Sequence, residues 1–184
     1  MTDARQRSLC QALSTLLSYP AGDAAAGAGA ARDLAEGTAA AGPLSRFAVA
    51  AGRIAGDDLQ EIYTSTFDLQ PACAPYLGHQ LLGDSPLRGP FLARLVEVYA
   101  ASGFRAREEL PDHLAEVLAY LAMAAPTAER DDLVRDGLLP ALARMLEGLP
   151  DRENPYRELL WAAQELFRPG HAATRDPAQL EVRP

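Results

Sequence analysis

The chain has 184 residues, of which 48% are hydrophobic and 23% charged, and its formal net charge is -8 at pH 7. This length suits one domain with its own core, and no apolar run reaches the roughly 20 residues that a membrane helix needs. The negative charge disfavours a nucleic acid partner, and every basic residue is arginine, which excludes Schiff-base and phosphate-loop lysines.

Helical periodicity begins at the amino end. Leucines recur at spacings of three and four residues before Pro20, which predicts a first helix and not a signal peptide. Residues 21–30 are small and are expected to form a linker. Weaker helical patterns follow over residues 31–40 and 43–55.

A stronger helix is predicted from Asp57 and Asp58, because acids are favourable at the positive end of a helix. It leads into YTSTFDLQPACAPYLGHQLLGDSPLRG, residues 63–89, where prolines prevent a continuous helix. Another helix is predicted to begin at Pro86 and to end near Gly103.

The run ELPDHLAEVLAYLA predicts a further helix that begins at a proline. Glu108, Glu109 and Asp112 are expected in its first turn, where the helix dipole favours acids. Asp112 and His113 are then expected near the surface. This interpretation is preferred to an acid–base cluster.

The carboxyl-terminal part predicts two short helices or one bent helix over residues 127–149, because Gly137 and Pro140 lie inside the pattern. A last helix is predicted from Asn154 to residue 168. No segment alternates as a strand would, so the predicted class is all-α, a single-domain bundle of six or more helices over residues 1–168. The tail 169–184 lacks apolar periodicity and is expected to be disordered.

Two kinds of catalytic chemistry are alternatives to this packing. Cys73, His79 and His113 are the residues that a metal-binding or thiol-dependent bundle enzyme would use. They lack the C-x-x-C, H-x-x-x-H or E-x-x-H spacing of metal sites in bundles, and no third group orients a cysteine–histidine pair. Cys10 and Cys73 are predicted to be reduced thiols. The sequence therefore predicts neither an enzyme nor a cofactor or metal site.

The segment 63–89 is better explained as a binding surface. Tyr63, Phe67 and Tyr76 offer wide aromatic contact area, and neighbouring acids favour a basic ligand. The alternative, that Tyr63 and Phe67 are core residues of their helix, stays open. A third possibility is a structural subunit, in which the same residues form a permanent interface.

Four motifs in order resemble the NarJ branch of the NarJ/TorD/DmsD family of redox-enzyme maturation chaperones. They are Y-x-x-x-F-D at residues 63–68, G-D-S-x-x-R-G at residues 83–89, YAASGF at residues 99–104 and ELPDHL at residues 109–114. The proline-rich QPACAPYLGHQ departs from a nitrate-reductase chaperone and leans towards relatives that serve selenate, chlorate or ethylbenzene oxidoreductases. The acidic tail of some relatives is absent.

The resemblance implies a cytoplasmic, all-helical chaperone without catalytic activity. Its partner would be the catalytic subunit of a molybdenum oxidoreductase of the dimethyl-sulfoxide-reductase family, bound through its N-terminal leader or leader remnant. The chaperone would hold that subunit for insertion of the bis-molybdopterin guanine dinucleotide cofactor, before membrane attachment or export. No cofactor of its own is implied.

The resemblance also implies a peptide groove in two stretches of the chain. The residues are Tyr63, Phe67, Asp68, Pro75 and Tyr76 in the first stretch, and Glu109, Leu110, Pro111, Asp112 and His113 in the second. Asp68, Glu109 and Asp112 are expected to meet basic residues of the peptide. An ordinary histidine pKa would make the affinity depend on pH through His113.

Overall fold

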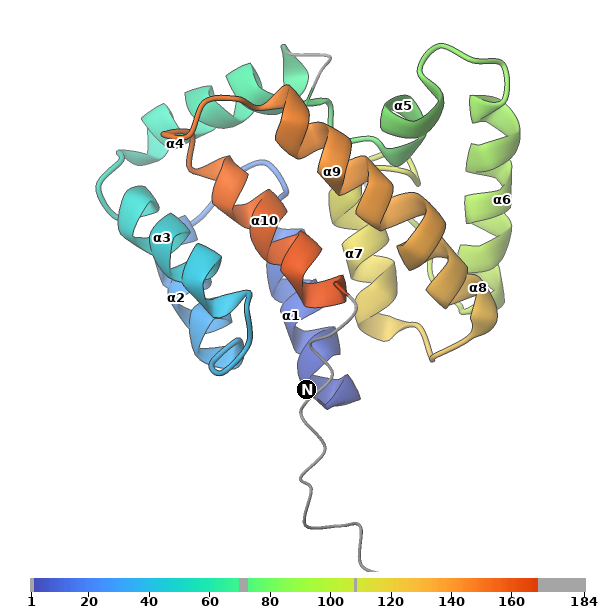
Figure 1. Cartoon of the computed structure of the whole chain (residues 1–184), viewed down its shortest axis with the longest axis horizontal. Helices are drawn as coiled ribbons and strands as arrows, with labels where there is room; N and C mark the ends of the chain where they lie inside the picture. Colours follow the sequence, from blue (N-terminus) through green and yellow to red (C-terminus); the bar gives the residue numbers. More distant parts are fainter. Residues whose placement is uncertain (1, 70–72, 108, 169–184) are drawn as a thin grey trace, which may run out of the picture.

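The computed structural model describes residues 2–69, 73–107 and 109–168, and these residues form a bundle of helices (Figure 1). The first half comprises α1 (Asp3–Leu16), α2 (Ala24–Leu34), α3 (Ala41–Ala51), α4 (Gly56–Tyr63) and the π-helical turn η1 (Thr64–Asp68). The second half comprises α5 (Leu77–Leu82), α6 (Arg88–Ala101), α7 (Leu114–Met123), α8 (Ala128–Asp132), the π-helical turn η3 (Leu133–Leu138), α9 (Leu139–Gly148) and α10 (Tyr156–Phe167). The all-α class and the number of helices predicted are confirmed.

The core lies around α1, which packs against α7, α2 and α10. In Figure 1, α2 and α3 lie on one side of this centre, and α5 and α6 lie on the other. Leu9 and Leu13 of α1 and Leu118 and Leu121 of α7 are fully buried. Each such side chain contributes roughly 1.5–3 kcal/mol by its removal from water, which explains why the leucine spacing predicted these helices well.

The expectation of a linker at residues 21–30 is wrong. The side chain of Asp23 accepts a hydrogen bond from the Ala26 backbone N–H and caps α2, which begins at Ala24. Ala28 and Ala31 are fully buried, since their small side chains let α2 pack closely on α3. Tertiary packing thus overrides the low helix propensity of the glycines.

The helix predicted within ELPDHLAEVLAYLA begins only at Leu114, where His113 is the N-cap. Glu109 and Asp112 precede the first turn and do not belong to it. Glu108 lies outside the described residues. The acid that lies in the first turn of α7 is Glu116, whereas Glu109 and Asp112 have other contacts.

The pattern over residues 127–149 forms one rod, in which α8 passes through η3 into α9. Pro140 lies at the start of α9, directly after the π-helical turn, where the altered hydrogen-bonding register accommodates a residue without an N–H. Gly137 is buried within η3. Of the two alternatives, two separate helices do not form, because the helical turns continue without a break from Ala128 to Gly148.

None of the helices within residues 2–69, 73–107 and 109–168 is long and apolar enough to cross a bilayer. The tail predicted to be disordered, 169–184, and the prolines at 71 and 169 lie outside the described residues.

Candidate functional site

Two predicted site segments, one before α5 and one before α7, lie side by side. Tyr76 and His113 form an isolated antiparallel β-bridge. The Leu77 N–H donates to the Asp112 carbonyl at 2.8 Å, and the Leu114 N–H donates to the Pro75 carbonyl at 2.7 Å. The ELPDHL motif is therefore joined by its main chain to the segment that carries Pro75 and Tyr76, two stretches that are far apart in the sequence.

Asp112 is buried beneath this bridge, which corrects the expectation that it lies near the surface. It is 0% exposed, and its Oδ2 accepts a hydrogen bond of 3.0 Å from the Gly78 N–H. The Arg88 guanidinium lies 3.5 Å from the same oxygen. Burial raises the pKa of the Asp112 carboxyl, and the charge of Arg88 opposes that rise. We call Asp112, Gly78 and Arg88 the Asp112 cluster.

Tyr76 connects the Asp112 cluster to the surface. Its hydroxyl donates to the Glu109 carboxylate at 3.0 Å, and the Arg88 guanidinium lies 5.8 Å from its ring centroid. Burial first, then the hydrogen bond to Glu109, raises the pKa of Tyr76 to about 12, with smaller contributions from the charges of Glu109, Asp112 and Asp68. The half-buried Tyr76 thus lies in an acidic environment, as the sequence suggested.

His113 is also buried and serves the fold. Its Nδ1 accepts the N–H of Ala115 at 3.2 Å, and its ring meets that of Tyr76 edge to face at 5.2 Å. Burial lowers the pKa of His113 from 6.5 to about 4, although the charges of Glu116 and Asp68 oppose that effect. The expectation of an ordinary histidine pKa is therefore wrong.

The low pKa of His113 makes stability depend on pH. The folded chain favours the neutral ring, so this contribution is complete above the unfolded pKa of 6.5 and is lost as the pH falls towards 4. We expect the free energy of unfolding to fall by about 2 kcal/mol between neutral pH and pH near 5 through this residue. Urea unfolding at both pH values measures it.

The matched variant is His113→Asn, because asparagine caps a helix well and does not titrate over this range. The opposing contribution of Asp112 is present in both proteins and cancels in the comparison. The expected result is a smaller loss of stability on acidification in the variant. Identical losses in the two proteins would contradict a buried neutral His113.

Tyr63 and Phe67 lie in the core. They are 4% and 2% exposed, and their rings meet that of Tyr156 at centroid distances of 5.5 and 5.3 Å. The π-helical turn η1 that carries Phe67 is tied to the α9–α10 connection, since Asn154 Nδ2 donates to Thr66 Oγ1 at 2.7 Å. The sequence left open whether Tyr63 and Phe67 form a binding surface or belong to the core. In the structure they pack as core residues.

The remaining predicted residues divide between interior and surface. Pro75 is buried, and Pro111 is partly buried. Asp68 and Glu109 are exposed, and Leu110 is 48% exposed. The surface part of the prediction thus consists of acids and an apolar residue beside Tyr76.

Glu109 also lines a groove of about 510 Å³, which we call the α6 groove. Its floor contains Tyr99 and Phe104, which are nearly buried and meet edge to face at 5.0 Å. The Tyr99 hydroxyl donates to the Pro111 carbonyl at 2.8 Å, which fixes one wall. The lining residues are Val96, Tyr99, Ala100, Phe104, Arg105, Ala106, Glu109 and Pro111. The groove is therefore rigid and aromatic, with one carboxylate at its rim.

Several residues of this site were not singled out from the sequence. Arg88 belongs to the motif G-D-S-x-x-R-G, and Tyr99 and Phe104 belong to YAASGF, so the motifs did contain the signal. Gly78 carried no signal in the sequence, because its partner Asp112 is 34 residues away. A second hollow of about 430 Å³, near the end of α1, has a mixed polar and apolar lining that includes Gln11. It contains none of the predicted residues.

The alternative of a thiol or metal enzyme gains no support from the geometry. Burial raises the pKa of the Cys73 thiol to about 12, so Cys73 is protonated at neutral pH and a poor nucleophile. His113 uses Nδ1 as a helix cap. Among residues 2–69, 73–107 and 109–168, no group of three or more His, Cys, Asp and Glu side chains is placed to hold a metal ion.

Comparison with known proteins places this geometry in a family. The model of the family described as nitrate reductase delta subunit matches residues 31–160, which include every predicted site residue. The chain belongs to the nitrate reductase delta subunit family. No curated protein matches the sequence.

A solved structure agrees with this membership of the delta subunit family. The chain is similar to a candidate redox enzyme maturation protein from Archaeoglobus fulgidus, with 26% identity and a TM-score of 0.58. The similarity covers 86% of this chain and 91% of the other. Family and fold together indicate a redox enzyme maturation chaperone, and the resemblance noted from the motifs is confirmed.

Proposed function

We propose that this chaperone binds the N-terminal leader or leader remnant of a molybdoenzyme catalytic subunit in the α6 groove. It holds the subunit in the cytoplasm for insertion of the bis-molybdopterin guanine dinucleotide cofactor, before membrane attachment or export. The observation that carries the proposal is the groove itself, which residues of the YAASGF and ELPDHL motifs help to line, and which has an aromatic floor and carries Glu109 at its rim.

The chemistry of the groove suits an apolar peptide that carries basic residues. Tyr99 and Phe104 provide a preordered floor, and Val96 is 53% exposed, so an apolar side chain of the peptide would be removed from water there. Glu109 and the exposed Asp68 lie near Tyr76 and favour a basic residue at that end. Arg105 also lines the groove, and its positive charge disfavours a basic residue of the peptide at that position.

The test is calorimetric titration with the N-terminal peptide of the molybdoenzyme catalytic subunit encoded beside this chain. We expect saturable one-to-one binding that weakens with salt, since charge contributes to it. Glu109→Gln should weaken binding about tenfold, which corresponds to about 1.4 kcal/mol. Glutamine keeps an acceptor for the Tyr76 hydroxyl. The variant therefore removes the negative charge and retains the hydrogen bond.

Two controls make this titration specific. Glu147→Gln removes an exposed acid on α9, away from the groove, and should leave affinity unchanged. Arg105→Gln removes the cation of the groove and should leave affinity unchanged or raise it. Equal affinity of the wild-type chain and Glu109→Gln, with both folded, would place the peptide elsewhere.

A further inference from the structure

The outer side of α3 carries a stripe of exposed residues that the α6 groove does not involve. Arg46 and Val49 lie on the side of α3 opposite the buried Leu44 and Phe47, and the exposed Arg53 follows in the turn after the helix. Val49 is 52% exposed and offers an apolar contact between the two arginines. A shallow hollow of about 290 Å³ runs along this stripe.

Trp161 of α10 extends this stripe. It is the only tryptophan of the chain and is 42% exposed. The Arg46 guanidinium lies 5.2 Å from its ring centroid, and its indole N–H donates to Glu165 at 3.2 Å. The ring is thus held in one position while much of it meets solvent. We call Arg46, Val49, Arg53 and Trp161 the α3–α10 face.

The exposed charge of the α3–α10 face is positive. Glu158 forms an ion pair of 2.8 Å with Arg46, and its side chain is only 18% exposed. Glu165 is 9% exposed and pairs with Arg168 at 2.7 Å. Both acids are therefore engaged and largely covered, whereas the Arg46 side chain is 51% exposed.

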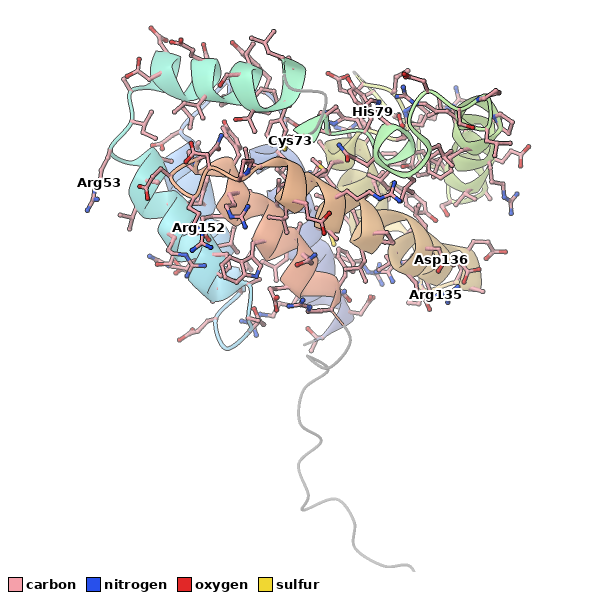
Figure 2. All side chains as sticks on the ribbon, turned by 45° about the horizontal axis from the view of Figure 1, so that its top comes forward. Arg53, Cys73, His79, Arg135, Asp136 and Arg152 are labelled. Carbon is pink, nitrogen blue, oxygen red and sulfur yellow. The ribbon has the colours of Figure 1, made fainter. Side chains whose placement is uncertain are left out.

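The backbone N–H of Arg53 donates to the Ala50 carbonyl at 3.0 Å. Its guanidinium has no hydrogen-bond or ion-pair partner within residues 2–69, 73–107 and 109–168, and Figure 2 shows the side chain extending away from the ribbon. Asp57 and Asp58 follow in the first turn of α4, and neither is within ion-pairing distance of it. A free arginine beside an apolar residue is notable on a chain whose net charge is -8.

We propose that the α3–α10 face binds an acidic, apolar segment of a partner protein. A carboxylate of that segment pairs with Arg53 and the exposed edge of Arg46, and an adjacent apolar side chain packs between Val49 and Trp161. Preordered tryptophan and arginine side chains are the residues that contribute most to protein interfaces. Nucleic acid fits this face less well, because its few arginines can neutralise only a few phosphates.

This face is separate from the α6 groove in position and chemistry. In Figure 1, α3 and α6 lie on opposite sides of the molecule. The groove presents Glu109 to a basic peptide, and the α3–α10 face presents arginines to an acidic one. The inference therefore does not rest on the proposed peptide binding, and either can fail alone.

The test uses the fluorescence of Trp161, since no other tryptophan contributes. The purified full chain is titrated with a synthetic amphipathic peptide of leucine and glutamate, and in parallel with its leucine and lysine counterpart. We expect a saturable blue shift with the acidic peptide only, because the indole ring loses contact with water. The shift should weaken as salt is added.

Matched charge-reversal variants complete the test. Arg53→Glu should weaken binding of the acidic peptide at least tenfold. Arg94 is an exposed arginine of α6, and Arg94→Glu should leave the titration unchanged. An equal shift with the lysine peptide, with a single-stranded oligonucleotide, or on simple concentration of the chain would overturn the proposal. So would the absence of any shift with the acidic peptide.

Discussion

Replacing Asp112 by alanine should cost the folded protein about 3 kcal/mol, because it leaves buried polar groups without their partner. The Gly78 N–H would lose the 3.0 Å hydrogen bond to the carboxylate, and the Arg88 guanidinium would lose its counter-charge. Arg88 is 28% exposed, so water replaces part of that interaction and the cost stays below that of a fully buried pair. Urea unfolding followed by circular dichroism measures it.

The matched control is Asp68→Ala, an exposed acid of the other predicted segment, which should change the free energy of unfolding by less than about 0.5 kcal/mol. If Asp112→Ala were as stable as Asp68→Ala, the Asp112 cluster would not be a structural element. If Asp112→Ala is destabilised as expected, a loss of peptide binding in this variant has a simple explanation, because the substitution disturbs the wall of the α6 groove from within.

Replacing Gly78 by alanine should destabilise the protein by about 3 kcal/mol, through the side chain that it adds. A Cβ at this position would lie 2.7 Å from Asp112 Oδ2, 3.1 Å from Phe91 and 3.2 Å from Arg88. The nearest atom is the oxygen that accepts the Gly78 N–H. The methyl group therefore cannot be accommodated while the hydrogen bond keeps its present geometry.

Gly29→Ala is the control for this substitution, since a Cβ there meets nothing within 4 Å and the residue lies inside α2. Alanine is the better helix former by about 1 kcal/mol, so this variant should be as stable as the wild type or more so. The same unfolding experiment compares the two. A Gly78→Ala protein of undiminished stability would show that the loops before α5 and α7 separate easily.

The sequence predicted the elements whose stability comes from apolar periodicity. The leucine spacing before Pro20 and the stripe of α10 gave helices at nearly the positions observed, because burial of these faces decides the fold. The helix α2 was not predicted, because it lacks a strong apolar periodicity. Its glycine and alanine content is a poor local signal, and its helicity depends on close packing against α3.

The site was predicted in its residues but not in their arrangement. Asp112 and His113 are polar and follow a proline, which locally favours an exposed helix start. Their burial depends on Gly78 and Tyr76, and no local pattern records a partner so distant in sequence. The core position of Tyr63 and Phe67 depends in the same way on Tyr156. Long-range polar contacts are what sequence periodicity cannot supply.

The β-bridge between Tyr76 and His113 also has a consequence for motion. It closes the base of an excursion of the chain, the segment between Pro75 and Leu114 that contains α5 and α6. Within the bundle, α5 also packs against α9 and η3. A segment fastened at its base opens as one unit, because release of either end breaks the same hydrogen bonds. We therefore expect α5 and α6 to form a single cooperative unit of local unfolding, so that any widening of the α6 groove is a movement of the whole excursion.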